Sequence, residues 1–202
     1  MPNRFLSDTV VEYSRPLQGQ ADEVTTCTRT ACLSFVIVAQ YGGLEEPGTD
    51  ICAQKIAGDT LSVHTLASRH NRTAAGSDLT GRPVHNRPEG IALVESCQTA
   101  LTIRGRYTAQ EMGSDISIDG LDKALASSVA HALCHAEFEV RILNLPSRAK
   151  HADNLCNRGL RGRGIELDLS HDLRERLMAD PGLMGQFAAA VRSGLQSVLA
   201  DC

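Results

Sequence analysis

The order of short apolar strands and amphipathic helices is the feature that most constrains the fold of this chain. Residues 34–39 form a β-branched apolar run that leads to Gly42 and Gly43, which predicts a buried strand opening into a functional loop. The next segment is predicted to be a helix that starts near Thr49 and stops before Gly58. Residues 60–66 then alternate as a second strand. This succession is typical of an α/β unit.

The same alternation continues along the remaining sequence. Further helices are expected from Pro88, after Asp119-Gly120, from about His171 to Met178, and over about 181–200. Further strands are expected at 100–104, 138–143 and 164–169, with polar loops at 68–87 and 107–118. At 202 residues the chain has the size of one domain. We therefore predict a single α/β domain over residues 1–202, with one sheet and helices on both faces.

Charge and composition exclude several classes of partner. The net charge of −4 and the pI near 6.0 give no general basic face, so no nucleic-acid partner is expected. No run of 18 apolar residues occurs, so no membrane association is expected. The apolar stretch behind Arg4 is too short for a signal peptide, and we expect a cytoplasmic protein. Seven cysteines without a C-x-x-C pair predict free thiols and no thiolate zinc site.

Three segments carry the functional signal. They are Tyr41-Gly42-Gly43-Leu44-Glu45-Glu46-Pro47-Gly48-Thr49, Thr102-Ile103-Arg104-Gly105, and Asn154-Leu155-Cys156-Asn157-Arg158-Gly159 with Gly164-Ile165-Glu166-Leu167-Asp168-Leu169-Ser170. In this order they resemble segments of the poly-γ-glutamate hydrolase family, which read H-G-G-x-x-E-P-G-T, S-I-H-G, and N-x-C-N-R-G with G-x-Q-L-E-L-S. The resemblance covers about residues 35–174. It implies a zinc carboxypeptidase-like fold, an open mixed β-sheet with the site at one edge.

The resemblance also shows where this chain departs from the family. In the family, two histidines and a glutamate hold one zinc ion, and a further glutamate is the base. The matching ligand positions here are Tyr41, Glu46 and Arg104, and the matching base is Asp168. A guanidinium has no lone pair to offer a metal, and a phenol ionises only near pH 10. We therefore expect a divergent member without a metal cofactor, in which Arg104 pairs with Glu46 and Asp168.

The remainder of the motifs predicts a pocket for a substrate. In the family this region shapes a pocket for an acidic substrate, and Arg158 is suited to bidentate capture of a carboxylate. An alternative is that the asparagines and Cys156 only brace a tight loop. The residues predicted to bind substrate are Gly42, Gly43, Thr49, Asn154, Asn157 and Arg158.

Several histidines are further candidates for the site. His85, in the long polar loop, is a candidate catalytic base, with an exposed loop histidine as the alternative. His131 and His135 have the i,i+4 spacing of a metal pair, although a solvated helix end is the preferred interpretation. We interpret His64 as a packed core histidine.

These observations lead to one main functional hypothesis and to alternatives from other classes. The main hypothesis is a metal-independent enzyme for a small carboxylate- or amide-bearing molecule, serving in specialised metabolism. Tyr41 would be the general acid, Asp168 or Glu46 the base, and Arg104 the group that stabilises an oxyanion or enolate. Cyclisation, isomerisation, elimination and condensation remain open.

The first alternative is a catalytically silent protein that binds acidic ligands. The second is a residual zinc-dependent hydrolase of γ-glutamyl amides. A third alternative is purely structural, in which Glu46, Arg104 and Asp168 form only a buried salt-bridge network.

Overall fold

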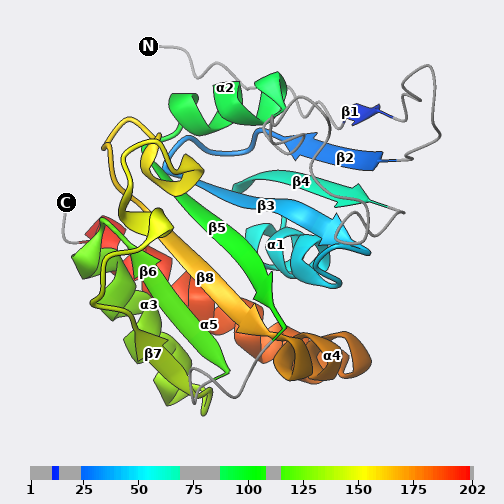
Figure 1. Ribbon diagram of the computed structural model, residues 1–202, viewed down its shortest axis with the longest axis vertical. Helices are drawn as coiled ribbons and strands as arrows, with labels where there is room; N and C mark the ends of the chain where they lie inside the picture. The colour runs from blue at the N-terminus through cyan, green and yellow to red at the C-terminus, as the bar shows by residue number, and fades with distance from the viewer. Residues whose placement is uncertain (1–10, 14–23, 69–86, 108–114, 201–202) are drawn as a thin grey trace.

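The computed structural model describes residues 11–13, 24–68, 87–107 and 115–200. In this part of the chain, eight strands form one sheet with the order β1-β2-β4-β3-β5-β8-β6-β7 (Figure 1). The central strands β4, β3, β5 and β8 run parallel, whereas β2 and β6 are antiparallel to their neighbours β4 and β8. The strands are β1 (Val11–Tyr13), β2 (Val24–Arg29), β3 (Phe35–Gly43), β4 (Ser62–Ser68), β5 (Thr99–Arg106), β6 (Ile116–Gly120), β7 (Val140–Ile142) and β8 (Ile165–Ser170).

Helices cover both faces of this mixed sheet, as predicted (Figure 1). The larger core lies between the sheet and α1 (Thr49–Ala57), α3 (Lys123–His135), α4 (His171–Ala179) and α5 (Pro181–Ala200). The smaller core lies on the opposite face, under α2 (Pro88–Ser96) and the 3₁₀ turn η3 (Leu155–Asn157). A second 3₁₀ turn, η2 (Arg148–Lys150), lies against β6 and η3. Alternation along β3 divides its apolar side chains between the two cores, because successive residues of a strand point to opposite faces.

Strand β8 shows how this alternation creates a functional face. Ile165, Leu167 and Leu169 are fully buried in the larger core. Glu166 and Asp168 alternate with them and point to the other face of the sheet. The apolar residues therefore anchor the strand, while two carboxyl groups are presented towards the η2 and η3 turns.

Several elements differ from the sequence-based expectations. β6 replaces part of a predicted polar loop, and its Ile116 and Ile118 are fully buried by pairing of the strand with β7 and β8. β7 is shorter than predicted, because Phe138 instead packs edge-on against Phe187 of α5, with ring centroids 5.6 Å apart. The N-terminal strands β1 and β2 were not predicted.

Most of the predicted loop at 68–87, including His85, lies outside the described residues. Ser68 itself ends strand β4. None of the helices in the described part of the chain is long and apolar enough to cross a membrane.

Candidate active site

The site lies where the central parallel strands β3, β5 and β8 end. Tyr41 is near the end of β3, and Arg104 of β5 lies directly opposite Asp168 of β8. The pairing of β3 with β4 shifts between Ala39 and Gly42, which places one extra residue in β3 at this point. Such bulges re-aim side chains and are common beside active sites. The carboxyl ends of parallel strands are also the usual location of ligand sites in α/β sheets.

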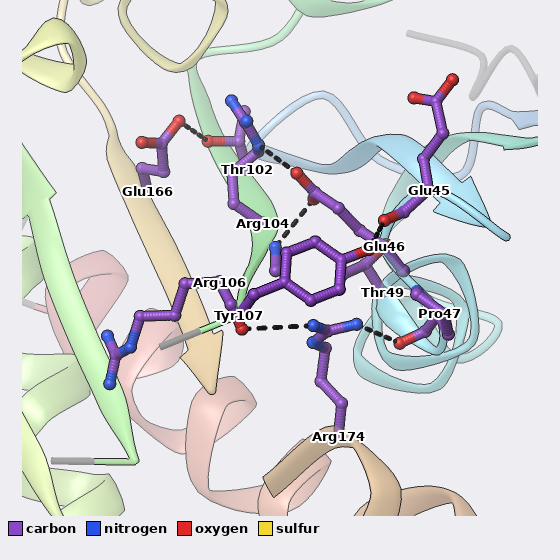
Figure 2. A network of polar contacts seen from close by, with 11 residues as sticks. Glu45, Glu46, Pro47, Thr49, Thr102, Arg104, Arg106, Tyr107, Glu166 and Arg174 are labelled. Atoms are coloured by element: carbon purple, nitrogen blue, oxygen red, sulfur yellow. Dashed lines mark hydrogen bonds and ion pairs between the residues drawn. The ribbon is translucent and has the colours of Figure 1, made fainter. Parts of the chain in front are cut away.

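Arg104 is held by two of the residues that the motifs placed beside it. Its Nε donates to Glu46 Oε1 at 3.2 Å (Figure 2). Its guanidinium carbon lies 4.1 Å from the centroid of the Tyr41 ring. The backbone N–H of Gly105 donates to Glu46 Oε2 at 2.7 Å, so each carboxylate oxygen has a partner. The guanidinium is thus fixed on one edge by a carboxylate and on one face by an aromatic ring.

The loop that carries Glu46 is fastened by its own backbone. The N–H of Glu46 donates to the carbonyl of Tyr41 at 2.7 Å, and Thr49 Oγ1 donates to the carbonyl of Glu46 at 2.9 Å. Gly43 has a φ of +74°, and a Cβ there would come within 2.2 Å of the carbonyl oxygen of Ser68. Gly43 and Thr49, two of the residues predicted to bind substrate, therefore shape the loop that presents Glu46.

A buried arginine supports the loop that carries Glu46. Arg174 of α4 is 1% exposed and donates from Nη1 to the carbonyl of Pro47 at 2.7 Å and from Nη2 to the carbonyl of Arg106 at 3.3 Å (Figure 2). It joins the Glu46 loop to the end of β5. Gly105 makes room for it, because a Cβ at that position would lie 2.7 Å from Arg174 Cζ. Sequence reasoning gave Arg174 no role, since a lone helical arginine carries no local signal of burial.

An open cavity of about 590 Å³ lies over these residues on the η2 and η3 side of the sheet. Tyr41, Arg104 and Asp168, three of the predicted catalytic residues, share its wall. Glu46 lies behind Arg104 and is not among the described residues that line the cavity. The lining consists of Gln40, Tyr41, Arg104, Asp119, Leu143, Ser147, Arg148, Ala149, His151, Asp153, Asn154, Leu155, Glu166 and Asp168.

Glu166 is the functional candidate that sequence reasoning missed. Its Oε2 accepts a hydrogen bond from Thr102 Oγ1 at 3.3 Å (Figure 2). Burial and then the nearby charge of Asp168 raise the pKa of Glu166 to about 7, although Arg104 opposes the rise. A carboxyl group that titrates near neutral pH is suited to acid–base chemistry. The available signal was its position two residues before Asp168, which puts both on the same face of a strand.

Burial also raises the pKa of Asp168, Glu46 and Tyr41. The pKa of Asp168 is raised by burial, against the effect of Arg104 and Arg106. Burial raises the pKa of Glu46 as well, despite the adjacent Arg104. The pKa of Tyr41 is raised by burial, so its phenol stays protonated and remains a hydrogen-bond donor at neutral pH.

The predicted asparagines brace the loop around η3. Asn157 is 3% exposed, donates to the carbonyls of Ala149 and His151 at 2.7 and 2.8 Å, and accepts from the N–H of Gly164 at 3.0 Å. Asn154 lines the cavity, and its Oδ1 caps η3 by accepting from the N–H of Cys156 at 3.0 Å. Asn157 thus uses both ends of its amide within the protein and is not among the described residues lining the cavity. Asn154 does line the cavity, although its Nδ2 also donates to the carbonyl of Arg148 at 3.3 Å.

The arginines of the same segment point to other partners. Arg158 pairs with Glu95 of α2 at 2.5 Å, and it is not among the described residues lining the cavity. Arg161 and Arg163 approach Asp122, the N-cap of α3, at 3.8 and 3.4 Å. The cluster of positive charge predicted from the sequence is therefore divided between two acidic residues. Arg148 and Arg104 are the arginines that line the cavity.

The residues at this position do not fit a zinc site. Zinc needs three ligands with available lone pairs, and Arg104 instead presents N–H donors to Glu46 where a ligand would stand. The described residues contain no cluster of three or more His, Cys, Asp or Glu side chains that could hold a metal.

The other histidines considered in the sequence analysis lie in two places within the described residues. His131 and His135 are exposed on α3, with ring centroids 4.4 Å apart, and line a separate groove against α5. His64 is 1% exposed, its Nδ1 lies 2.8 Å from Thr28 Oγ1, and burial lowers its pKa to about 4. Neither environment lies in the main cavity.

Comparison with known proteins agrees with this architecture. The family model for poly-γ-glutamate hydrolase matches residues 16–191. The chain belongs to the poly-γ-glutamate hydrolase family. The match extends on both sides of the region over which the sequence motifs alone showed the resemblance, and no curated protein matches the sequence.

Solved structures show the same fold at low sequence identity. A bacteriophage poly-γ-glutamate hydrolase superposes with a TM-score of 0.76 and 14% identity, covering 92% of this chain and 94% of the phage protein. A zinc-free structure named YndL superposes with a TM-score of 0.69 and 17% identity, covering 86% of this chain and 89% of that protein. An N-acetylmuramoyl-L-alanine amidase from Clostridium difficile superposes with a TM-score of 0.52 and 12% identity, covering 83% of this chain and 97% of the amidase. The chain therefore has a zinc carboxypeptidase-like α/β fold on a hydrolase-like scaffold.

Proposed function

We propose that this family member is a metal-independent enzyme that acts on a small carboxylate- or amide-bearing substrate in the cavity over β5 and β8. One observation carries the proposal. The guanidinium of Arg104 is fixed by Glu46 and Tyr41 on the wall of a cavity that also holds the carboxyl groups of Asp168 and Glu166. A fixed cation beside a titratable base can deprotonate a substrate and hold the negative charge that develops.

Each residue of this group has a distinct role in the proposed chemistry. Asp168 removes a proton from the substrate, and the released electron pair moves onto a neighbouring carbonyl oxygen. Arg104 stabilises the resulting oxyanion, and the protonated phenol of Tyr41 supplies a proton to the product. Glu46 acts as a positioning residue, because it contacts Arg104 and not the cavity. Glu166, with a pKa near 7, can exchange protons with the substrate at neutral pH.

Turnover with and without metal tests this proposal. Purified protein would be incubated with chelator and then assayed by mass spectrometry against poly-γ-glutamate, γ-glutamyl dipeptides and a panel of small amides and carboxylates. We expect turnover that survives the chelator and falls by at least roughly 100-fold in Asp168→Asn, the loss typical of a removed general base. Activity that disappears with chelator and returns with zinc would show that the metal-independent mechanism is wrong.

A ligand-binding protein without turnover is the second candidate. Both oxygens of Glu46 are already hydrogen-bonded, so the charge of Arg104 is partly neutralised before any ligand arrives. Such a saturated pair is also what a purely structural network would contain. Binding of a panel compound with no product formed under any tested condition would favour this candidate over the enzyme.

A further inference from the structure

We propose that the cavity recognises a zwitterionic α-amino acid group, with the carboxylate bound by Arg104 and the ammonium bound by Asp168 and Glu166. The inference deepens the proposed function, since it names the class of substrate for the same site. It concerns binding alone, so it can be tested whether or not the protein turns its ligand over.

The free edge of Arg104 provides the carboxylate-binding half of the site. Glu46 occupies Nε and Tyr41 covers one face, but no residue in the described ranges accepts a hydrogen bond from the two Nη atoms. The side chain is still 33% exposed, and it lines the cavity. Two parallel N–H donors on a planar, immobilised guanidinium match the two oxygens of a carboxylate.

The ammonium-binding half lies on the neighbouring strand. Within the described residues, the carboxylate of Asp168 has no hydrogen bond or ion pair with another side chain, although it faces the cavity. Glu166 is contacted by the hydroxyl of Thr102 and by the side chain of Asn154, both of which leave room for a further donor on its carboxyl group. Ammonium groups carry three donors and no acceptor, so two adjacent carboxyl groups suit them.

The spacing of the two halves fits one amino acid group. Arg104 and Asp168 are paired in register on adjacent parallel strands, and such strands lie about 4.8 Å apart. Because both side chains reach the same cavity from neighbouring positions, a ligand with a carboxylate and an ammonium on the same carbon can contact both of them. The cavity volume of about 590 Å³ leaves space for a substituent of at least dipeptide size.

The charges around the cavity favour a zwitterion over a simple dicarboxylate. Lys150 neutralises Asp119 at 3.0 Å, and Glu46 partly neutralises Arg104. Asp168 and Glu166 form no ion pair within the described residues, although the charges of Arg104 and Arg106 act on Asp168. A ligand that brings only negative charge would be repelled by them, whereas a ligand ammonium would stabilise their ionised forms. Arg148 is an exposed cation on the cavity wall and is the alternative anchor for a ligand carboxylate.

Three matched dipeptides isolate the two halves of the site. γ-Glutamylglutamate carries both the ammonium and the α-carboxylate on its first residue. Glutarylglutamate lacks only that ammonium, and 4-aminobutanoylglutamate lacks only that carboxylate. Titration calorimetry on the full-length protein should show γ-glutamylglutamate binding at least about tenfold more tightly than either analogue, since each removed contact is a charge-assisted hydrogen bond.

Conservative variants assign each preference to a residue. Asp168→Asn should reduce the preference over glutarylglutamate and keep the preference over 4-aminobutanoylglutamate. Arg104→Lys keeps a cation for Glu46 but removes the bidentate edge, so it should abolish only the preference over 4-aminobutanoylglutamate. Arg148→Gln is the control, and both preferences should survive in it. Circular dichroism of each variant confirms that it is folded.

The proposal is overturned if glutarylglutamate binds as tightly as γ-glutamylglutamate, if none of the three dipeptides binds at millimolar concentration, or if Arg148→Gln rather than Arg104→Lys removes the carboxylate preference. Product formation is followed in the same samples. Selective binding without product would support the zwitterion site while contradicting the proposed catalysis, so the two failures are distinguishable.

Discussion

The carboxyl group of Glu166 should make the protein less stable as the pH rises, and Glu166→Gln should remove this effect. In the folded protein the pKa of Glu166 is about 7, whereas its ordinary value is 4.5. A raised pKa means that the folded state holds the proton more tightly. The contribution of Glu166 to the free energy of unfolding is therefore fully present below about pH 4.5 and is lost as the pH rises through about pH 7. The shift corresponds to roughly 3 kcal/mol of unfolding free energy between about pH 4 and pH 8.

The test uses the difference in unfolding free energy between the wild type and Glu166→Gln at each pH. His64 has the opposite effect over nearly the same range, because its lowered pKa of about 4 makes the folded state less stable as the pH falls. The two contributions nearly cancel in the wild-type profile. Urea unfolding followed by circular dichroism at pH values between about 4 and 8 gives the free energies for both proteins. We expect the variant to gain up to about 3 kcal/mol on the wild type as the pH rises across this range.

A constant difference between the two proteins at all pH values would refute the reasoning. It would mean that Glu166 titrates at an ordinary pKa, so that neither burial nor Asp168 perturbs it. Asp168→Asn provides a second check, because removing the neighbouring negative charge should lower the pKa of Glu166 and shift the pH dependence to lower values. No change in the midpoint of that dependence would show that the two carboxyl groups are not coupled.

Three further predictions concern stability. The wild type should lose up to about 3 kcal/mol of unfolding free energy through His64 as the pH falls from about 6.5 to about 4, and His64→Gln should remove this loss. Urea unfolding measures it, and a variant with the same loss as the wild type would contradict the burial of this imidazole. Asn157→Ala should lower the unfolding free energy by about 2–4 kcal/mol, because three backbone groups lose a hydrogen-bond partner and two of these bonds are buried. Arg158→Ala should change the unfolding free energy by less than about 1 kcal/mol, and similar losses in the two variants would refute the distinction. Gly43→Ala should lower the melting temperature by several degrees, since a φ of +74° and the backbone of Ser68 leave no place for a Cβ, and a melting temperature equal to that of the wild type would contradict this geometry.

The sequence predicted the central strands and the main helices because their signals are local. The β-branched run before Gly42, the apolar stripe of α3 and the proline at the start of α5 each report the structure of their own segment. Strand β6 was missed because its five residues lie in a polar stretch, and only pairing with β8 and β7 makes it a strand. The register of the sheet likewise depends on partners distant in the sequence.

For the site, the motifs alone were sufficient to place Tyr41, Glu46 and Arg104 together. They identified the replacement of two ligand positions, and the contact between Arg104 and Glu46 follows from their opposite charges. They did not show that Arg158 faces Glu95, because the direction of a loop side chain depends on what packs beside it. They also gave no sign that Arg174 is buried beneath the site.

The sequence by itself therefore determined which chemical groups are available and which strands carry them. The tertiary structure alone decided which of these groups share one cavity and how their protonation is altered. Glu166 shows the physical reason, since its identity and position are visible in the chain, but its raised pKa comes from burial and from the charge of Asp168 across a folded surface. Desolvation and charge proximity are properties of packed neighbours, and packing exists only once the sheet has formed.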